Sequence, residues 1–176
     1  MPDAPGLELI AQELNGAVEG AILETHYEHE QGALIANPER ITEVLAWLRD
    51  TPGQEYRSLS SLHAADYLPA KPRFGVHYEL LCMGRVERLR VKAPLQDPGG
   101  DELPELDSCV HLFPTAEFHE REAYDFFGIV FRGHPDLRRI LMPEDYEGWP
   151  LRRDFPVGGE PVLFTHNEVE MPRWYE

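Results

Sequence analysis

The pattern of apolar residues changes after Gly128. Upstream, apolar residues recur with the spacing of helices or strands, whereas residues 132–176 contain six prolines, frequent glycines and no regular period. This segment still carries many large apolar side chains, which a disordered tail would lack. It must be buried on its own sheet or on another protein, and a partner is favoured because loops this long are usually functional. We predict an α+β domain over residues 1–131 and an extended, proline-rich C-terminal arm over residues 132–176.

The clearest predicted helix lies within "NPERITEVLAWLRDTPG", residues 37–53. Asn37 can cap it, and Pro38 suits the first helical position, where its missing N–H group costs nothing. Proline and glycine at the end of the segment stop it. One apolar stripe follows the helix at i, i+3, i+4 and i+7, and it consists of Ile41, Val44, Leu45 and Leu48.

Strand-like segments surround this helix and are followed by a second helix. A strand at 20–27 and its return at 32–36 form a predicted hairpin. The later segments are strands within 55–68, 74–83 and 85–93, a loop at 94–105 rich in proline, glycine and acids, and a helix at 115–127 with Thr115 as cap and Gly128 as stop. These elements predict an antiparallel or mixed sheet with helices on one face.

Composition and charge exclude several kinds of function. The chain has 176 residues and a net charge of −16, which disfavours nucleic acid and anionic lipid as partners of the whole molecule. We expect no membrane span and no export or mitochondrial signal, because the N-terminus is acidic and no apolar run is long enough. Two cysteines cannot hold a four-cysteine zinc or iron–sulfur site, and we expect them to be reduced thiols.

The helix at 115–127 carries an unusual set of charges. Glu117, Arg121 and Asp125 follow one another at intervals of four residues, which predicts a modest ladder of surface ion pairs. Glu120 instead points into the apolar side of the helix, where an unpaired carboxylate would be costly. Arginine pairs well with a buried carboxylate, and several arginines follow. We therefore predict that Glu120 pairs with an arginine and fastens the C-terminal arm to the helix.

Catalytic and metal-binding patterns in this region are weak. The "HE" at 119–120 lacks the second histidine of a zinc protease, and "GIVFRG" lacks the ending of a phosphate-binding loop. His134 with Glu122 or Asp136 could bind a metal, but any stretch with this many acids offers such pairs. The residues therefore favour a binding surface over an active site.

The run "EREAYDFFGIVFRGHPDLRRIL", from Glu120 to Leu141, resembles the signature of the 30-kDa subunit of respiratory complex I, which in bacteria is the C-type subunit of NADH-quinone oxidoreductase. The following "MPEDYEGWPLRRDFPV" resembles the family's next block, with Trp149 where histidine is usual. Weaker similarity extends over about residues 20 to 165, and "SLHAADY" departs from the family but keeps Asp66. The signature positions are Glu120, Arg121, Glu122, Asp125, Phe126, Phe127, His134, Arg138, Ile140 and Leu141.

The resemblance implies a non-catalytic subunit in the hydrophilic arm of a hetero-oligomeric complex, on the cytoplasmic side of the bacterial plasma membrane. The complex would oxidise NADH, reduce a quinone and move protons, while NADH, FMN, iron–sulfur clusters and quinone would belong to other subunits. The implied partner is a separate 49-kDa-type (D-type) protein, besides other subunits of the hydrophilic arm. We predict a partner interface of Glu120, Arg121, Glu122, Asp125, Phe126, Phe127, His134, Arg138, Arg139, Arg152 and Arg153.

Two alternatives remain at this stage. Homologous subunits of a membrane-bound hydrogenase or another electron-input complex share the signature, and the neighbouring genes would distinguish them. An independent enzyme of unknown chemistry is a remote alternative, which a stoichiometric metal or flavin in the purified chain would favour.

Overall fold

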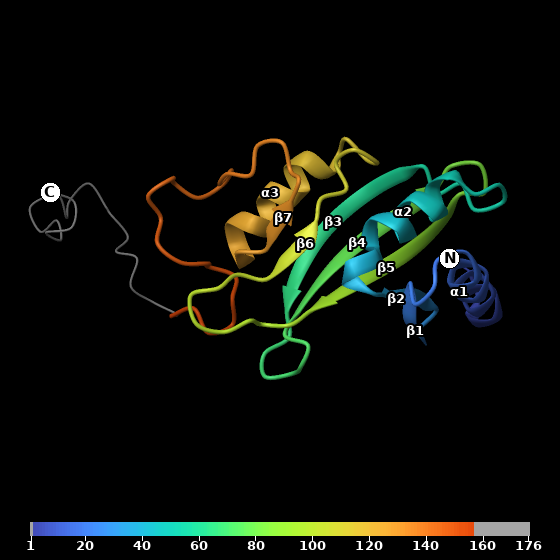
Figure 1. The fold of residues 1–176 in the computed structure, drawn as a ribbon, viewed down its shortest axis with the longest axis horizontal. Helices are drawn as coiled ribbons and strands as arrows, with labels where there is room; N and C mark the ends of the chain where they lie inside the picture. The colour runs from blue at the N-terminus through green and yellow to red at the C-terminus, as the bar shows by residue number, and fades with distance from the viewer. Residues whose placement is uncertain (1, 157–176) are drawn as a thin grey trace, which may run out of the picture.

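The computed structural model describes residues 2–156, so residues 157–176 of the predicted C-terminal arm lie outside the described residues. Figure 1 shows how the elements are arranged. In chain order they are α1 (Ala4–Ala17), β1 (Ile22–Glu28), β2 (Gln31–Ala36), the 3-10 turn η1 (Pro38–Arg40), α2 (Ile41–Asp50), β3 (Ser58–Asp66), β4 (Phe74–Cys82), β5 (Glu87–Leu95), β6 (Glu105–Asp107), α3 (Ala116–Phe127) and β7 (Val130–Arg132).

The main sheet has five strands in the order β1-β2-β5-β4-β3. Neighbouring strands are antiparallel except β2 and β5, which pair in parallel through residues 33–35 and 90–92. The hairpin predicted for 20–36 is therefore confirmed as β1 and β2, and the sheet is mixed. The connection that contains α2 carries the chain from β2 to the opposite edge of the sheet at β3. The antiparallel strands β3, β4 and β5 then bring β5 back beside β2, where the two strands pair in parallel.

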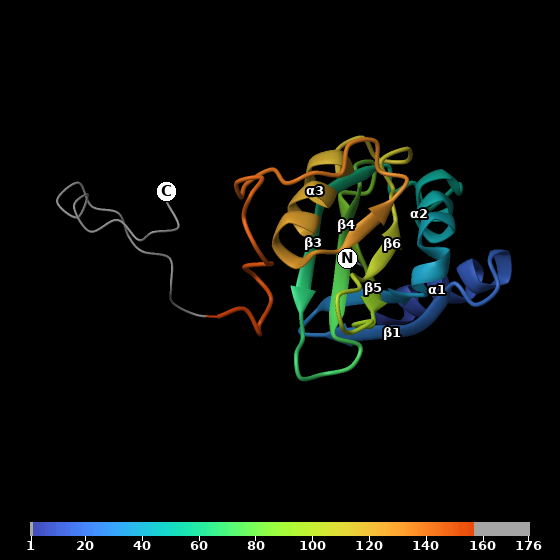
Figure 2. The same ribbon diagram turned by 60° about the vertical axis from the view of Figure 1, so that its left-hand side comes forward.

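Three helices bury their apolar stripes in one core on one face of this sheet. All four residues of the stripe predicted for 41–48 are fully buried in α2. Asn37 caps the 3-10 turn that leads into α2, since its side-chain oxygen accepts a hydrogen bond from Glu39 N at 3.1 Å. The predicted α+β class, with helices on one face of the sheet, is confirmed (Figures 1 and 2).

The N-terminal helix α1 was not among the predicted elements. Asp3 caps it by accepting a hydrogen bond from Gly6 N at 2.9 Å. Its buried side recurs with a helical period and consists of Leu7, Ile10, Ala11 and Leu14. The helix reaches the sheet at Gly32, where an added Cβ would lie 3.3 Å from Leu7 Cδ2.

A second sheet consists of two parallel strands, β6 and β7. Strand β6 precedes α3 in the chain, and β7 follows it. Strands of three residues are too short to show a period, so neither was predicted. Thr115 precedes α3 but makes no side-chain cap, because its hydroxyl donates to Leu59 O at 3.3 Å instead. Gly128 ends α3 as predicted, with a left-handed φ of 69° that favours glycine. Strand β7 ends at Arg132, one residue past the predicted boundary between domain and arm.

None of the helices in residues 2–156 is long and apolar enough to cross a membrane.

Candidate partner interface

The chain leaves β7 and returns along the outside of α3, as Figures 1 and 2 show in orange. Residues 133–156 contain no helix or strand. Their backbone is instead held by hydrogen bonds to α3 and to the end of β3. One of these joins Leu151 N to Phe126 O at 3.2 Å. The described part of the C-terminal arm is thus fixed by contacts with this chain.

Asp125 is the centre of the first attachment point. Its side chain is fully buried, and one carboxylate oxygen accepts hydrogen bonds from the backbone N–H groups of Ile140, Leu141 and Met142 at 2.7–3.0 Å. Burial alone would raise the pKa of Asp125, but these donors and Arg139 outweigh it and hold the pKa below its usual value. The carboxylate therefore stays ionised and fixes a sharp bend of the arm.

Arg139 completes this attachment. Its guanidinium donates to the other oxygen of Asp125 at 2.8 Å and to the backbone oxygens of Tyr146 and Gly148, both at 2.9 Å. The side chain of Arg139 is 11% exposed. One arginine thus joins α3 to two backbone oxygens of the arm, which a lysine could not do with the same planar geometry.

Arg121 and His134 secure the start of the arm. Arg121 donates to Arg138 O at 3.2 Å and to Arg139 O at 3.1 Å. It forms no ion pair with Glu117 or Asp125, so the predicted ladder of surface charges is wrong. The N–H of Asp136 donates to His134 Nδ1 at 3.0 Å, which places the ring proton on Nε2, where it donates to Glu117 O at 3.0 Å.

Glu120 does not hold the arm, and its predicted pairing with an arginine is wrong. The side chain is fully buried on the inner side of α3, facing the segment after β6. It accepts hydrogen bonds from Ser108 Oγ at 2.7 Å and Cys109 N at 2.8 Å. Burial raises the pKa of Glu120 despite these donors. The helical spacing correctly placed Glu120 on the apolar side of the helix, but it could not show which segment would face that side chain.

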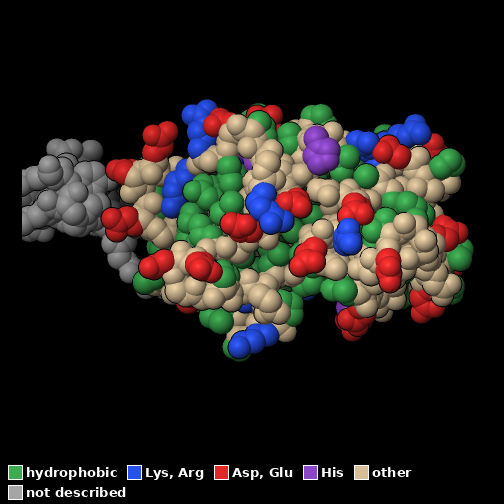
Figure 3. Space-filling model, viewed as in Figure 1, with side chains coloured by type: hydrophobic (Ala, Val, Ile, Leu, Met, Phe, Trp, Pro, Cys, Tyr) green, Lys and Arg blue, Asp and Glu red, His purple; other side chains and the backbone are tan. Residues whose placement is uncertain are grey.

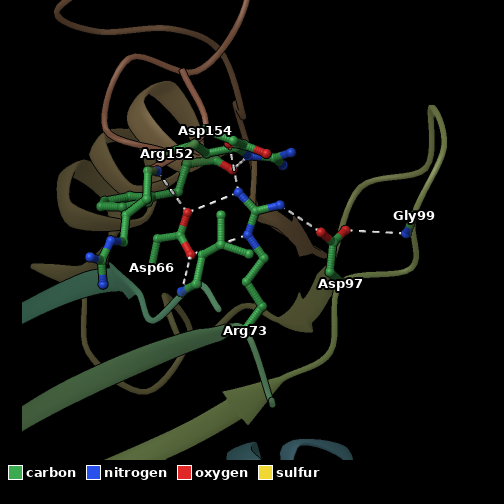
Figure 4. Close-up of polar contacts among 9 residues, drawn as sticks. Asp66, Arg73, Asp97, Gly99, Arg152 and Asp154 are labelled. Atoms are coloured by element: carbon green, nitrogen blue, oxygen red, sulfur yellow. Dashed lines mark hydrogen bonds and ion pairs between the residues drawn. The ribbon is translucent and has the colours of Figure 1, made fainter. Parts of the chain in front are cut away.

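A second attachment point, which sequence reasoning missed, centres on Arg73 (Figure 4). Arg73 directly precedes β4. Arg73 contacts Asp66 through two nitrogens at 2.9 and 3.1 Å, Asp97 at 2.7 Å and Asp154 of the arm at 2.7 Å. The Arg153 N–H also donates to Asp66 at 2.8 Å. Arg73 and its partners lie up to 81 residues apart in the chain, so no local sequence motif could indicate the cluster.

The donors around Asp66 keep it charged. Its side chain is 1% exposed, and burial alone would raise its pKa. Hydrogen bonds from Arg73, Arg153 N and Leu68 N outweigh burial and lower that pKa. Figure 4 shows Asp66 and Asp154 converging on one end of the guanidinium of Arg73, with Asp97 at the other. The cluster therefore joins β3, β4, the loop after β5 and the end of the described arm.

Trp149 lies against the end of α3. It is the residue that stands where the resembled sequence block usually has histidine. It covers Gly128 so closely that a Cβ there would lie 2.5 Å from Trp149 Cε2. The guanidinium of Arg139 lies 4.6 Å from the centre of its ring, and that of Arg152 lies 5.9 Å away. Arg152 also donates to Phe127 O at 2.7 Å. Gly128 thus both ends the helix and makes room for the tryptophan.

The structure places the predicted interface residues in three settings. Glu122, Arg138 and Arg153 are exposed, while Glu120, Asp125 and Phe127 are buried; the other five are partly buried. All eleven lie on α3 or in the C-terminal arm, but Glu120 faces Ser108 and Cys109 instead of the arm. Their contact with another subunit stays a prediction.

Exposed apolar residues near the arm were not predicted as interface residues. Phe118 is 59% exposed on α3, and Leu141 and Leu151 of the arm are 60% and 53% exposed. Figure 3 shows hydrophobic side chains gathered over α3 and the arm, interleaved with charged ones. Leu141 was within the recognised signature, but only the structure shows that its side chain points outward.

Within residues 2–156, no group of three or more histidine, cysteine, aspartate or glutamate side chains is placed to hold a metal ion. Cys82 and Cys109 are both buried free thiols.

Residues 34–161 match the family described as "Respiratory-chain NADH dehydrogenase, 30 Kd subunit". This chain belongs to that family. It is 43% identical over 155 residues to the C-type subunit of NADH-quinone oxidoreductase from Roseiflexus castenholzii, covering 88% of this chain and 87% of the relative. It is 45% identical over 141 residues to the protein of the same name from Herpetosiphon aurantiacus, covering 79% of this chain and 80% of the relative.

The family's match includes the whole of α3 and the described arm, so the two attachment points lie inside the matched region. A solved structure of the membrane-bound sulfane sulfur reductase, an archaeal respiratory membrane complex, contains a chain of similar fold. The TM-score is 0.64 at 21% identity, with 85% of each chain covered. At this identity the likeness shows the fold alone.

Proposed function

We propose that this chain is a structural subunit of the hydrophilic arm of NADH:quinone oxidoreductase. It docks through α3 and the C-terminal arm against a 49-kDa-type subunit, on the cytoplasmic side of the membrane. NADH, FMN, iron–sulfur clusters and quinone are bound by other subunits, which carry out the electron transfer. Names of relatives at 43% and 45% identity support this complex over a related hydrogenase-type complex.

The observation that carries the proposal is that the arm has a fixed backbone and exposed apolar side chains. Its backbone follows a path without regular structure, yet Asp125 and Arg139 hold it at residues 140–148 and Arg73 holds it at residue 154. Leu141 and Leu151 nevertheless stay more than half exposed. A surface of fixed shape with apolar side chains pointing outward loses little conformational entropy when it binds, which favours docking.

The buried charged groups of the two attachment points are already engaged with each other and with the backbone of the arm. Asp125 accepts four hydrogen bonds from the arm and Arg139, and Arg73 contacts three carboxylates. Groups engaged in this way position a backbone and are poorly placed to exchange protons with a substrate. This supports a role in assembly for the site.

The test is co-expression of the full chain with the neighbouring 49-kDa-type subunit, followed by size-exclusion chromatography. Leu141→Asp and Leu151→Asp place a charge on the proposed docking surface and change only exposed side chains, so the backbone N–H of Leu141 that donates to Asp125 is kept. Met83→Asp is the matched control, because Met83 is 70% exposed in the turn between β4 and β5. We expect the wild type and the Met83 variant to co-elute with the partner.

The two arm variants should lose co-elution while their circular dichroism spectra and melting temperatures stay like those of the wild type. Burying an unpaired carboxylate in the interface costs several kcal/mol, or about a hundredfold or more in affinity. Co-elution of both arm variants at wild-type levels would show that the partner binds elsewhere and would refute the proposed interface.

A further inference from the structure

The turn between β4 and β5 presents two large apolar side chains to solvent. Val86 is 84% exposed and Met83 is 70% exposed, which makes them the two most exposed large apolar side chains among residues 2–156. Both lie in residues 83–86, which we call the hairpin tip. Apolar residues scattered singly over a surface are common, whereas two that share one turn form a local apolar surface.

Val86 has a backbone conformation that valine disfavours. Its φ of 51° lies in the left-handed region, and among the described residues it is the only β-branched residue with a positive φ. Glycine, asparagine or aspartate usually takes such a position in a hairpin turn, because a branched side chain is crowded by the backbone there. The side chain of Val86 is almost fully exposed, so packing within the described chain does not offset this strain.

Arg85 holds the hairpin tip in place. Its guanidinium donates to Gly53 O and to Gln54 O, the latter at 2.7 Å. It also pairs with Glu87 at 2.9 Å and lies 5.2 Å from the centre of the Tyr56 ring. These contacts join the tip to the segment that follows α2. A tip held in this way loses little conformational entropy when its side chains become buried, which favours contact with a partner.

The surroundings of the tip favour a protein over a membrane as the partner. Arg85 and Glu87 neutralise each other, so the tip brings no net positive charge to attract anionic lipid. A hollow of about 510 Å³ borders the tip, and its lining includes Asp3, Gln54 and Glu87. Insertion into a membrane would bring these carboxylates against the headgroups, and the net charge of −16 would add repulsion. A protein can offer an apolar pocket to the tip and polar groups to the hollow.

The small size of the tip limits which protein can bind it. Each partner of a stable protein complex buries about 800 Å² of surface, and two side chains supply only a small part of that area. The tip could not by itself hold a second copy of this chain or a free protein. It suits a subunit that other contacts already hold beside this chain.

The tip and the C-terminal arm lie at opposite ends of the main sheet. Arg73, which holds the arm, directly precedes β4, whereas the tip follows its last residue. Nine residues of strand separate the two, or about 30 Å at 3.3 Å per residue. Figure 1 shows the arm in orange at one end of the sheet and the turn between β4 and β5 at the other. The two surfaces therefore face different parts of an assembly.

We propose that the hairpin tip inserts into an apolar pocket of a subunit other than the 49-kDa-type protein, at a second interface of the complex. The side chains of Val86 and Met83 fill this pocket, and their burial offsets the strain at Val86. Binding of the 49-kDa-type subunit alone does not depend on Met83. The inference rests on the proposed membership of the complex but not on the docking of the arm.

The test uses the full chain, assembled in its complex, with photoreactive p-benzoylphenylalanine in place of Met83. Irradiation and mass spectrometry of crosslinked peptides identify the segment that touches this position. Leu23, which is 58% exposed on β1, is the matched control position. We expect position 83 to capture one segment with few charged residues, in one subunit other than the 49-kDa-type protein. Position 23 should not capture that segment.

Val86→Asn separates strain in this chain from contact with the partner. Asparagine tolerates a positive φ, so the isolated full chain should melt at the same temperature as the wild type or higher. The crosslink at position 83 should nevertheless fall about tenfold or more, since a polar amide would be buried in an apolar pocket. Glu30→Asn is the matched control, because Glu30 is exposed in the turn between β1 and β2 with a φ of 62°. It should leave the crosslink unchanged.

Several outcomes overturn the inference. If the chain purifies with the complex but position 83 captures no peptide, a lipid, a second copy of this chain or the 49-kDa-type subunit, the second interface is refuted and the proposed function stands. An unchanged crosslink with Val86→Asn refutes the apolar contact. A lower melting temperature of that variant would show that valine serves the fold of this chain instead. If the unmodified chain fails to purify with the complex, the proposed function fails first, and this inference fails with it.

Discussion

The sheet domain and the described part of the C-terminal arm are held in place by different forces. In the domain, three helices and five strands bury one apolar core with residues such as Leu45 and Tyr78 fully enclosed. In the arm, residues 133–156 form no regular structure, and buried ion pairs at Asp125 and Arg73 hold the backbone. Apolar burial specifies the domain, whereas polar contacts specify the path of the arm.

Two carboxylates on α3 show the same contrast at the level of single residues. Glu120 faces the domain, meets two donors and has its pKa raised by burial. Asp125 faces the arm, meets three backbone N–H groups and an arginine, and has its pKa lowered. Both side chains are fully buried, so the number and charge of the donors decide the direction of each shift.

The largest expected effect comes from Asp125→Ala. Removing this carboxylate leaves the guanidinium of Arg139 and three N–H groups without their acceptor, which should weaken attachment of the arm by about 3–5 kcal/mol. Hydrogen exchange should speed up at the amides of Ile140, Leu141 and Met142, while the amides of β4 keep their protection. The exposed pair of Asp136 and Arg138 gives the control, since Asp136→Ala should cost less than about 1 kcal/mol.

Equal loss of protection in β4 and in the arm would show that Asp125 supports the core as well. The contrast between polar attachment and apolar core would then be false for this part of the chain.

The core gives the next largest effect. Leu45→Ala removes a fully buried side chain from α2 and leaves a cavity, so the free energy of unfolding should fall by about 3 kcal/mol. Chemical denaturation followed by circular dichroism measures this loss. Leu9→Ala on the exposed side of α1 should change stability by less than about 0.5 kcal/mol.

In the Leu45 variant, hydrogen exchange should speed up across the sheet and the arm together, because the arm has no support once the domain unfolds. Faster exchange confined to the arm would contradict this dependence.

Elements with a local period could be predicted from the sequence. The stripe of α2 repeats within eight residues, and Gly128 ends α3 by a conformation that glycine favours, so both were correct. The order of strands depends on which distant segments pair, and the sequence allowed either an antiparallel or a mixed sheet. Helix α1 had a readable stripe and an Asp3 cap, so it could have been found by the same method.

The candidate site was only partly predictable for the same reason. Residues on α3 and in the arm could be recognised as a group, because they share a short stretch of sequence. The partner of each charge could not, since Asp125 rather than Glu120 faces Arg139, and Arg73 meets Asp154 from 81 residues away. Helical spacing gives the direction of a side chain, but tertiary packing decides what lies there.

The two directions of pKa shift predict opposite responses to pH. Asp125 and Asp66 have lowered pKa values, so their contribution to stability is present above the usual value of 3.8 and is lost as pH falls below it. Glu120 has a raised pKa, so its contribution is full below the usual value of 4.5 and is lost as pH rises through the raised value. Acidification toward pH 4.5 should therefore stabilise the contact of Glu120, and further acidification should release the arm.

The smallest expected effect is that of Glu120→Gln, which tests this assignment directly. Glutamine keeps the shape and can still bond to Ser108 and Cys109 but cannot ionise, so the variant should lose the decline in stability above pH 4.5. At pH 7 it should equal the wild type or exceed it by about 1 kcal/mol, and below pH 4.5 the two should converge. Denaturation midpoints across this range measure the difference, with the exposed Glu122→Gln as control. A variant several kcal/mol less stable at pH 7 would mean that ionised Glu120 is needed by the fold, and both α3 carboxylates would then act alike.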